Sequence, residues 1–156
     1  EKIFHRDSGG LVRPYFCDDA ETVVIALGSV LGTIKDVVDE ERSQGRSIGV
    51  LGITTFRPFP FEAVRAAMPK AKRIIVIEKA FQIGIGGIVS ENVKGAISGL
   101  DIACYSVVAG LGGRPITMSS LHALFTEAMA GGLEPLTFLD IDTDVVARES
   151  VSEGGR

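Results

Sequence analysis

A corner of small residues follows the first long apolar run and could bind a ligand. In LGSVLGT (27–33), Gly28 and Ser29 end the run, and Gly32 and Thr33 lie one turn further along. A strand that turns into a helix presents free backbone N–H groups, which bind phosphates and carboxylates. The stretch lacks both GxGxxG spacing and the lysine of a P-loop. The corner is therefore either a contact to an anion or partner protein, or a structural turn. In the turn, Ser29 would cap the helix and both glycines would let it approach the sheet.

Two arginines stand in stiff or tight stretches that follow later apolar runs. Arg57 lies within TTFRPFP (54–60), where two prolines restrict the backbone, and Arg114 lies within AGLGGRPIT (109–117). On the same edge of a sheet, the two guanidinium groups could converge on one carboxylate or pyrophosphate. The alternative for Arg57 is a salt bridge to a neighbouring domain.

The remaining polar candidates favour structural roles. Glu78 ends an apolar run before EKAFQIGIGGIVSEN (78–92), where it would cap the next helix or act as a general acid or base. His5 and His122 have no companion at metal-ligand spacing, so we expect ordinary surface or packed histidines. The D-x-D-x-D series at 140–144 lacks the glycine and glutamate of a calcium loop, and we expect it on one face of a strand. No residues are identified as catalytic, cofactor-binding or metal-binding.

Composition excludes several classes of function. The net charge is −4 and the pI is near 5.2, which gives no electrostatic reason to expect nucleic acid. No apolar run approaches the roughly 20 residues of a membrane span. Cys17 and Cys104 are the only cysteines in the sequence, too few for a four-cysteine iron–sulfur site, and we expect buried free thiols in a reducing cytoplasm.

Apolar runs alternate with helical patterns along most of the chain. Ile34, Val37 and Val38, for example, form one stripe of a helix that should end at Gly45. Thr117 is placed to cap the last helix of this series. The expected strands are 23–29, 47–53, 73–78 and 101–110, and the expected helices are 30–44, 60–68, 88 to about 99, and 118–131. Continuous apolar strands separated by helices predict a three-layer α/β/α fold with a mostly parallel sheet of about five strands.

We expect one domain over residues 1–156. Residues 1–20, which include LVRPYF (11–16), would form an arm or edge strand, and residues 132–156 a C-terminal extension in which PLTFLDID (135–142) could be a final strand. Four loops would lie at the carboxyl ends of the parallel strands, the edge where ligands and partners meet such sheets. Because the sequence begins with Glu1 and not Met, we expect a piece of a longer polypeptide.

Four blocks of the sequence together resemble a known family. VVIALGSVLGTIKDVVDE, SIGVLGITTFRPFPFEAV, RIIVIEKAFQIGIGGIVSENV and VVAGLGGRPIT, in this order and spacing, are similar to the second domain of 2-oxoacid:ferredoxin oxidoreductases. Pyruvate:ferredoxin oxidoreductase (pyruvate synthase) alpha chains carry the nearest likeness, over about residues 11–130. The resemblance implies a fold like the C-terminal domain of transketolase, with one antiparallel strand. Pro115 departs from the pattern, since an acidic residue often follows GLGGR there.

The resemblance implies an enzyme that decarboxylates a 2-oxoacid, with pyruvate yielding acetyl-CoA and CO₂. Thiamine diphosphate, Mg²⁺, iron–sulfur clusters and CoA would serve the assembly, and ferredoxin or flavodoxin would accept electrons. The thiamine diphosphate signature and the cluster cysteines do not occur in this sequence. We therefore expect a non-catalytic interface domain in a cytoplasmic, oligomeric enzyme. Candidate contacts to a partner or anion are Gly28, Ser29, Gly32, Thr33, Arg57 and Arg114.

Two other functions stay open. A stand-alone module could bind a nucleotide or anion at the Gly28–Thr33 corner. The same fold could also belong to a transketolase or a 2-oxoacid dehydrogenase beta chain, although RPFP followed by GLGGR argues against that. The expectation is that the Gly-Ser corner abuts a sister domain.

Overall fold

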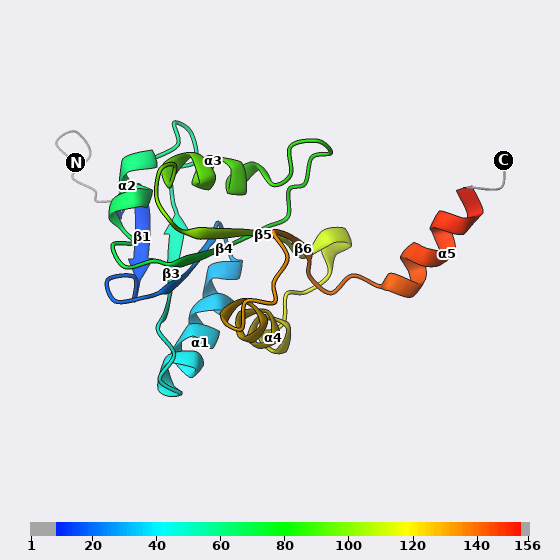
Figure 1. Ribbon diagram of the computed structural model, residues 1–156, viewed down its shortest axis with the longest axis horizontal. Coiled ribbons are helices and arrows are strands. Elements are labelled where there is room, and N and C mark those ends of the chain that lie inside the picture. The colour runs from blue at the N-terminus through cyan, green and yellow to red at the C-terminus, as the bar shows by residue number, and fades with distance from the viewer. Residues whose placement is uncertain (1–8, 154–156) are drawn as a thin grey trace.

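A six-stranded sheet runs through the computed structural model, which describes residues 9–153 (Figure 1). The strands are β1 (Val12–Tyr15), β2 (Thr22–Ala26), β3 (Ile48–Ile53), β4 (Arg73–Glu78), β5 (Ala103–Val108) and β6 (Leu136–Phe138). The helices are α1 (Val30–Ser43), α2 (Phe61–Ala66), α3 (Ile88–Ala96), α4 (Met118–Met129) and α5 (Thr143–Glu153), with a short 3₁₀ turn at Leu111–Gly113.

The sheet has the strand order β1-β3-β2-β4-β5-β6. Strands β2 to β6 pair in parallel, and β1 pairs antiparallel to β3. The chain therefore proceeds from β2 outward to β3, and then crosses back to β4 on the other side of β2. This arrangement confirms the mostly parallel sheet, and β1 supplies the single antiparallel strand. The edge-strand interpretation of LVRPYF is confirmed.

Helices cover both faces of the sheet, which confirms the three-layer architecture (Figure 1). Alternate side chains of each strand point to opposite faces, so the apolar runs supply two cores. One core joins α1 and α4 to the sheet through residues such as Ile34, Val50 and Phe125. The other joins α2 and α3 through residues such as Val64, Leu51 and Val93. All residues of β2 and β3 are buried, as parallel strands between two helical layers require.

Helix ends follow the capping chemistry expected from the sequence. Gly45 has a φ of +83° beyond α1, and its N–H donates to the Arg42 carbonyl while the Arg46 N–H donates to the Glu41 carbonyl. These two bonds form a Schellman motif, which favours glycine at the left-handed position. The Thr117 hydroxyl accepts a hydrogen bond from the Ser120 N–H at 3.1 Å and caps α4. Both predicted helix boundaries are confirmed.

The C-terminal segment contains the final strand proposed for residues 135–142, but that strand is shorter and a helix follows it. The sixth strand covers only Leu136–Phe138, and the chain then enters α5 at Thr143, which leads away from the body of the fold (Figure 1). The aspartates at 140–144 thus do not lie on a strand. Asp140 has a φ of +56°, and the Asp142 carboxylate accepts a hydrogen bond from the Val145 N–H at 3.0 Å at the start of α5. Aspartates favour such helix starts because a short carboxylate reaches the free N–H groups.

Within residues 9–153, no helix combines the length and the apolar character that crossing a bilayer demands.

Candidate functional site

The carboxyl ends of the parallel strands carry four loops on one edge of the sheet. We call this edge the rim, and it consists of residues 27–29, 54–60, 79–87 and 109–117 after β2, β3, β4 and β5. Because these four strands pair in parallel, their following loops must all emerge on the same side. The predicted placement of the four loops on a single edge is confirmed.

The corner after β2 forms without a side-chain cap. Gly28 has a φ of +80°, a conformation that favours glycine. Ser29 occupies the N-cap position of α1, but its hydroxyl makes no capping hydrogen bond, so the predicted capping role is wrong. The Leu31 and Gly32 N–H groups instead donate to the Gly28 and Ser29 carbonyls, at 3.3 and 3.2 Å. These turn bonds leave the Ser29 side chain exposed at the rim.

Gly32 does not serve helix–sheet packing, contrary to the prediction. A Cβ built on Gly32 would meet no atom within 4 Å. The close approach lies on the strand, since a Cβ on Gly52 would lie 2.9 Å from Leu31 Cδ1. The prediction assigned the close approach to a glycine of the helix, whereas the glycine that permits it lies on β3. The spacing of glycines in the sequence does not indicate which of two packed surfaces requires the small residue.

Glu78 caps α3, as expected from its place at the end of β4. Its carboxylate accepts hydrogen bonds from the Val89 N–H at 2.8 Å, the Ser90 N–H at 2.9 Å and the Ser90 hydroxyl at 2.6 Å. The side chain is buried, and Ser90 also hydrogen-bonds the Ser106 hydroxyl at 2.7 Å. A Cβ on Gly87 would lie only 2.0 Å from Glu78 Oε1, so this close approach requires glycine. Both carboxylate oxygens stabilise the helix start.

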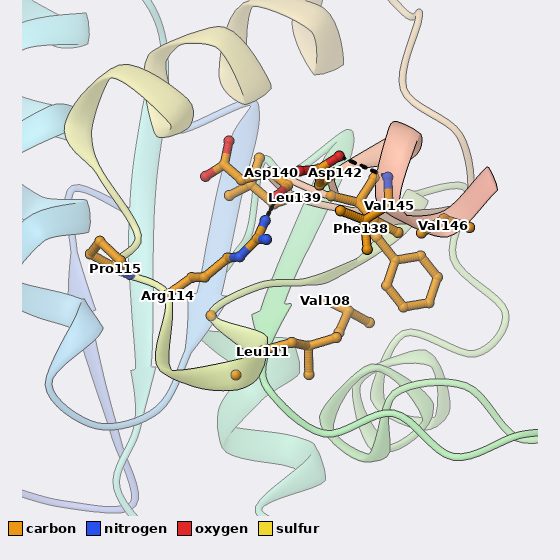
Figure 2. A pocket seen from close by; sticks show the side chains of 13 residues that line it. Val108, Leu111, Arg114, Pro115, Phe138, Leu139, Asp140, Asp142, Val145 and Val146 are labelled. Atoms are coloured by element: carbon orange, nitrogen blue, oxygen red, sulfur yellow. Dashed lines mark hydrogen bonds between the residues drawn. The ribbon is translucent and has the colours of Figure 1, made fainter. Parts of the chain in front are cut away.

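The two candidate arginines do not meet. Arg57 stacks on the Phe56 ring at 4.0 Å and donates to the Phe56 carbonyl at 3.0 Å and to Asn92 Oδ1 at 3.3 Å. Arg114 Nη1 donates to the Asp140 carbonyl at 2.7 Å, and Figure 2 shows its guanidinium reaching toward that residue. Strands β2 and β4 separate the strands after which the two arginines lie. Arg57 contacts its own loop and helix α3, whereas Arg114 contacts the segment between β6 and α5.

Three of the candidate residues do come together, with a fourth that the sequence had not ranked as a site residue. A hollow of about 290 Å³, here the cationic hollow, is lined by Ser29, Val30, Thr33, Lys79, Gly113, Arg114, Pro115 and Ile116. The fourth residue, Lys79, was not among the candidates predicted from the sequence. Its position directly after Glu78 at a strand end was the signal that could have identified it.

A second hollow adjoins the first. It has a volume of about 330 Å³, and we call it the apolar hollow; its lining is Leu27, Ser29, Val30, Ile77, Glu78, Lys79, Ala80, Val89 and Ile116. Both hollows lie beside the neighbouring parallel strands β2 and β4, where the order in which strands are added to the sheet reverses. At this point α1, after β2, and α3, after β4, pack on opposite faces of the sheet. Loops diverge at such a point and leave a crevice outside the strand ends.

A third hollow, of about 320 Å³, lies beside α5 (Figure 2). The loop that follows β5 forms one wall with Leu111, and β6 and α5 form the other with Phe138, Val145 and Val146. The sequence did not indicate this hollow, because α5 was not expected.

His122, predicted as an ordinary packed or surface residue, joins α4 to α1. Its Nδ1 lies 2.5 Å from Glu41 Oε1 and its Nε2 lies 2.7 Å from Glu40 Oε2. Hydrogen bonding to Glu41 is the main cause of a raised His122 pKa, with a further contribution from Glu40. Glu41 is buried and also pairs with Arg46, which donates to Thr126 Oγ1 at 3.2 Å. His5 lies outside the described residues.

The cysteines lie in surroundings that favour the protonated thiol. The Cys17 thiol is buried and donates to the Val50 carbonyl at 3.2 Å, and burial raises its pKa. Cys104 is only partly buried, so the expectation of buried thiols is confirmed for Cys17 alone; desolvation still raises the pKa of Cys104 to about 11. An iron–sulfur cluster is typically held by four cysteine thiolates, and the sequence supplies only these two cysteines. Across residues 9–153, no three histidine, cysteine, aspartate or glutamate side chains gather in a way that could hold a metal ion.

Comparison with known proteins gives consistent matches. The model of the family "Pyruvate:ferredoxin oxidoreductase core domain II" matches residues 20–121, which include all four loops of the rim. Pyruvate synthase subunit PorA of Methanosarcina barkeri is 35% identical over 153 residues, covering 94% of this chain and 38% of that protein. The Thermotoga maritima PorA subunit is 40% identical over 126 residues, covering 78% of this chain and 32% of that protein.

Other relatives have different names. The alpha subunit of NADH-dependent phenylglyoxylate dehydrogenase from Aromatoleum evansii is 38% identical over 136 residues, covering 84% of this chain and 33% of that protein. A solved 2-oxoglutarate:ferredoxin oxidoreductase from Magnetococcus marinus superposes with a TM-score of 0.60 at 19% identity, over 80% of this chain and 20% of that one. This last likeness concerns the fold alone. The chain thus spans about a third of the length of its relatives. Because the family model matches more than half of its residues, the chain belongs to the pyruvate:ferredoxin oxidoreductase core domain II family.

Proposed function

We propose that this chain is a non-catalytic interface domain of a thiamine diphosphate-dependent 2-oxoacid:ferredoxin oxidoreductase. The substrate proposed is pyruvate, with acetyl-CoA and CO₂ as products and ferredoxin or flavodoxin as electron acceptor. Two of the relatives described above are pyruvate synthase subunits, and the family model that matches this chain is that of a pyruvate:ferredoxin oxidoreductase domain; both support the enzyme class.

The observation that carries the proposal is that the Glu78 carboxylate is fully engaged in hydrogen bonds to α3. This buried carboxylate, at the rim that the family model covers, is bound by three hydrogen bonds at the start of α3. An acid–base catalyst needs a lone pair or proton free for the substrate. The polar chemistry of the rim therefore favours docking over catalysis, with Gly28, Ser29, Gly32, Thr33, Arg57 and Arg114 as the proposed contacts.

The cofactors are assigned to other parts of the assembly. Thiamine diphosphate with Mg²⁺ would supply the carbanion chemistry, iron–sulfur clusters the electron transfer, and CoA the acyl acceptor. The two cysteines of this sequence are too few to hold a cluster with four thiolates, which supports this assignment. Two free thiols also support a cytoplasmic location. We further propose that residues 1–156 act as one domain, with 1–20 as an N-terminal arm or edge strand and 132–156 as a C-terminal extension.

Two measurements test this function. A polypeptide carrying this chain, tagged and purified with its bound proteins, is expected to reduce a viologen dye in the presence of pyruvate and CoA. Calorimetry of the chain by itself with thiamine diphosphate and Mg²⁺ is expected to detect no binding. Micromolar affinity of the lone chain, or purification without partner subunits, would refute the proposal.

A small-anion site at the Gly28–Thr33 corner is the second candidate function. The cationic hollow favours it, because Lys79 and Arg114 line that hollow. If this candidate holds, millimolar pyrophosphate raises the melting temperature of the chain, and Lys79→Ala removes the shift. The absence of a shift in the unmodified chain would eliminate it.

A further inference from the structure

We propose that the two adjoining hollows at the rim receive a segment of another part of the enzyme in which an acidic side chain neighbours an aliphatic one. This inference rests on the proposed interface function and specifies the chemistry of the partner. The acidic side chain would lie in the cationic hollow, between Lys79 and Arg114, and the aliphatic side chain in the apolar hollow beside it.

The charge of the cationic hollow calls for a carboxylate. Lys79 and Arg114 line it, and its lining includes no acidic residue. Within residues 9–153, the Lys79 ammonium has no ion pair or hydrogen bond. Arg114 uses Nη1 for the Asp140 carbonyl, which leaves the other donors of its guanidinium group available. In a chain whose net charge is −4, a cationic recess without an internal counterion favours an anionic partner.

The hydroxyls at the same place add hydrogen-bonding capacity. Ser29 is exposed at the cationic hollow and makes no capping bond to α1. Thr33 also lines the cationic hollow, one helical turn further along. A carboxylate between two cations and two hydroxyls would receive charge-assisted hydrogen bonds, which are stronger than neutral ones.

The apolar hollow distinguishes a protein segment from a free anion. It shares Ser29, Val30, Lys79 and Ile116 with the cationic hollow, so one occupant can enter both. Aliphatic side chains, including Leu27, Ile77 and Val89, line it. Its one carboxylate, Glu78, is already bound at the start of α3. A phosphate would fill only the cationic hollow, whereas a peptide with an aliphatic residue beside an aspartate or glutamate would fill both.

The loop that begins at Lys79 points to the same kind of partner. Ile83 is 91% exposed and Ile85 is 55% exposed near the tip of this loop. Reciprocal hydrogen bonds between Gln82 and Gly86, at 2.9 and 2.8 Å, hold the tip in a fixed turn. A preorganised loop loses little conformational entropy on binding, and exposed apolar clusters mark protein contacts. The cation and the isoleucines on one loop therefore fit one protein surface.

Carbodiimide cross-linking tests the contact directly. The reagent joins an amine to a touching carboxylate as an amide, the lost water being taken up as the urea formed from the carbodiimide. In the assembled enzyme, mass spectrometry is expected to find Lys79 linked to an aspartate or glutamate of another domain or subunit, next to an aliphatic residue. Lys79→Arg keeps the positive charge but cannot form the amide, so the assembly remains and the linked peptide disappears.

Lys70 provides the matched control. It is exposed and lies before β4, at the opposite edge of the sheet from Lys79. Lys79→Glu is expected to weaken recovery of the partner proteins about tenfold at physiological salt, because it places a negative charge against the proposed carboxylate. Lys70→Glu is expected to change recovery less than twofold.

The outcomes separate this inference from the proposed function. If the enzyme assembles and other lysines are cross-linked while Lys79 is not, the inference is wrong and the interface function stands. If no partner proteins are recovered with the unmodified chain, both fail. If pyrophosphate raises the melting temperature in a Lys79-dependent way and Lys79 forms no link, the hollow is a small-anion site, and the inference is overturned.

Discussion

At the scale of single residues, the contact between Glu78 and the start of α3 fixes the geometry of the rim. A side chain at the end of β4 satisfies two backbone N–H groups that a helix leaves unpaired at its start. The interaction ties a strand of the sheet to the helix that covers it. Part of the third rim loop is therefore rigid where it approaches the hollows.

Replacing Glu78 with glutamine should destabilise the chain by roughly 1–3 kcal/mol. The NH₂ group of the glutamine would face a backbone N–H, and it cannot accept a hydrogen bond from that donor. Urea unfolding followed by circular dichroism measures the change. Glu134→Gln is the control, since that side chain is exposed and should alter stability by less than about 0.5 kcal/mol. Equal stability of the two variants would show that the carboxylate does not hold α3.

Gly87 of the rim and Gly32 in the first turn of α1 should respond in opposite ways to alanine. Gly87→Ala places a Cβ at 2.0 Å from Glu78 Oε1, and we expect a loss of about 1–3 kcal/mol. Gly32→Ala meets no atom within 4 Å inside a helix, and we expect a gain of about 0.5–1 kcal/mol. Thermal unfolding of both variants measures the contrast. Gly32→Ala would also show whether Gly32 contacts a partner, since the more stable chain would then assemble less well.

At the scale of secondary-structure elements, α1 and α4 are joined by a polar contact as well as by their shared core. His122 of α4 lies between Glu40 and Glu41 of α1, and Arg46 approaches Glu41 from the loop after α1. Burial of an unpaired Glu41 would be costly, so these partners permit a carboxylate at that position.

Stability should depend on pH through His122. Its pKa in the folded chain is raised above 6.5, chiefly by the hydrogen bond to Glu41. The folded state therefore holds the proton more tightly than the unfolded state does. The stabilisation is present in full below about pH 6.5 and is lost as the pH rises through the raised folded-state value.

The measurement compares the unmodified chain with His122→Gln in urea at about pH 5.5 and about pH 8.5. We expect the difference in unfolding free energy between the two proteins to be larger at the lower pH. A difference that is constant, or that grows toward alkaline pH, would contradict the assignment.

The sequence predicted the long central elements well, but not the bounds of β6 or the presence of α5. The stripe of Ile34, Val37 and Val38 predicted α1, because intervals of three and four residues place all three on one face of a helix, and all three are buried. Strand β6, in contrast, has only three residues, none of them fully buried, and α5 begins among polar residues. Neither element has a periodic pattern long enough to indicate its type.

At the scale of the whole molecule, the parallel sheet explains why the rim was predictable and its contacts were not. The parallel direction of the strands brings residues 27–29 and 109–117 to one edge of the sheet, so the apolar runs that predict parallel strands are enough to place these loops. Which side chains meet depends on loop conformation. Arg114 bonds the Asp140 carbonyl in the short turn between β6 and α5, a helix that the sequence did not predict. Lys79 and Ser29 line the same hollow only because α1 and α3 diverge.

The exposed tip of the third rim loop provides the test at this scale. Ile83 is 91% exposed and packs little within the chain, so Ile83→Asp should leave the unfolding free energy within about 0.5 kcal/mol of the unmodified value. If the rim is covered by neighbouring protein, the same substitution places a charge in an apolar contact, and recovery of partner proteins should fall at least severalfold.

Leu100→Asp is the matched control for that substitution. Leu100 is also exposed, at 42%, but it precedes β5 and lies at the edge of the sheet opposite the rim. Size-exclusion chromatography with quantitative mass spectrometry of the recovered proteins measures both variants. A fall in recovery for Ile83→Asp alone would locate the partner at the rim, since the two substitutions introduce the same charge on opposite edges. Equal recovery would mean that the tip of the loop stays in water in the assembled enzyme, and the exposed isoleucines would then have no role in docking.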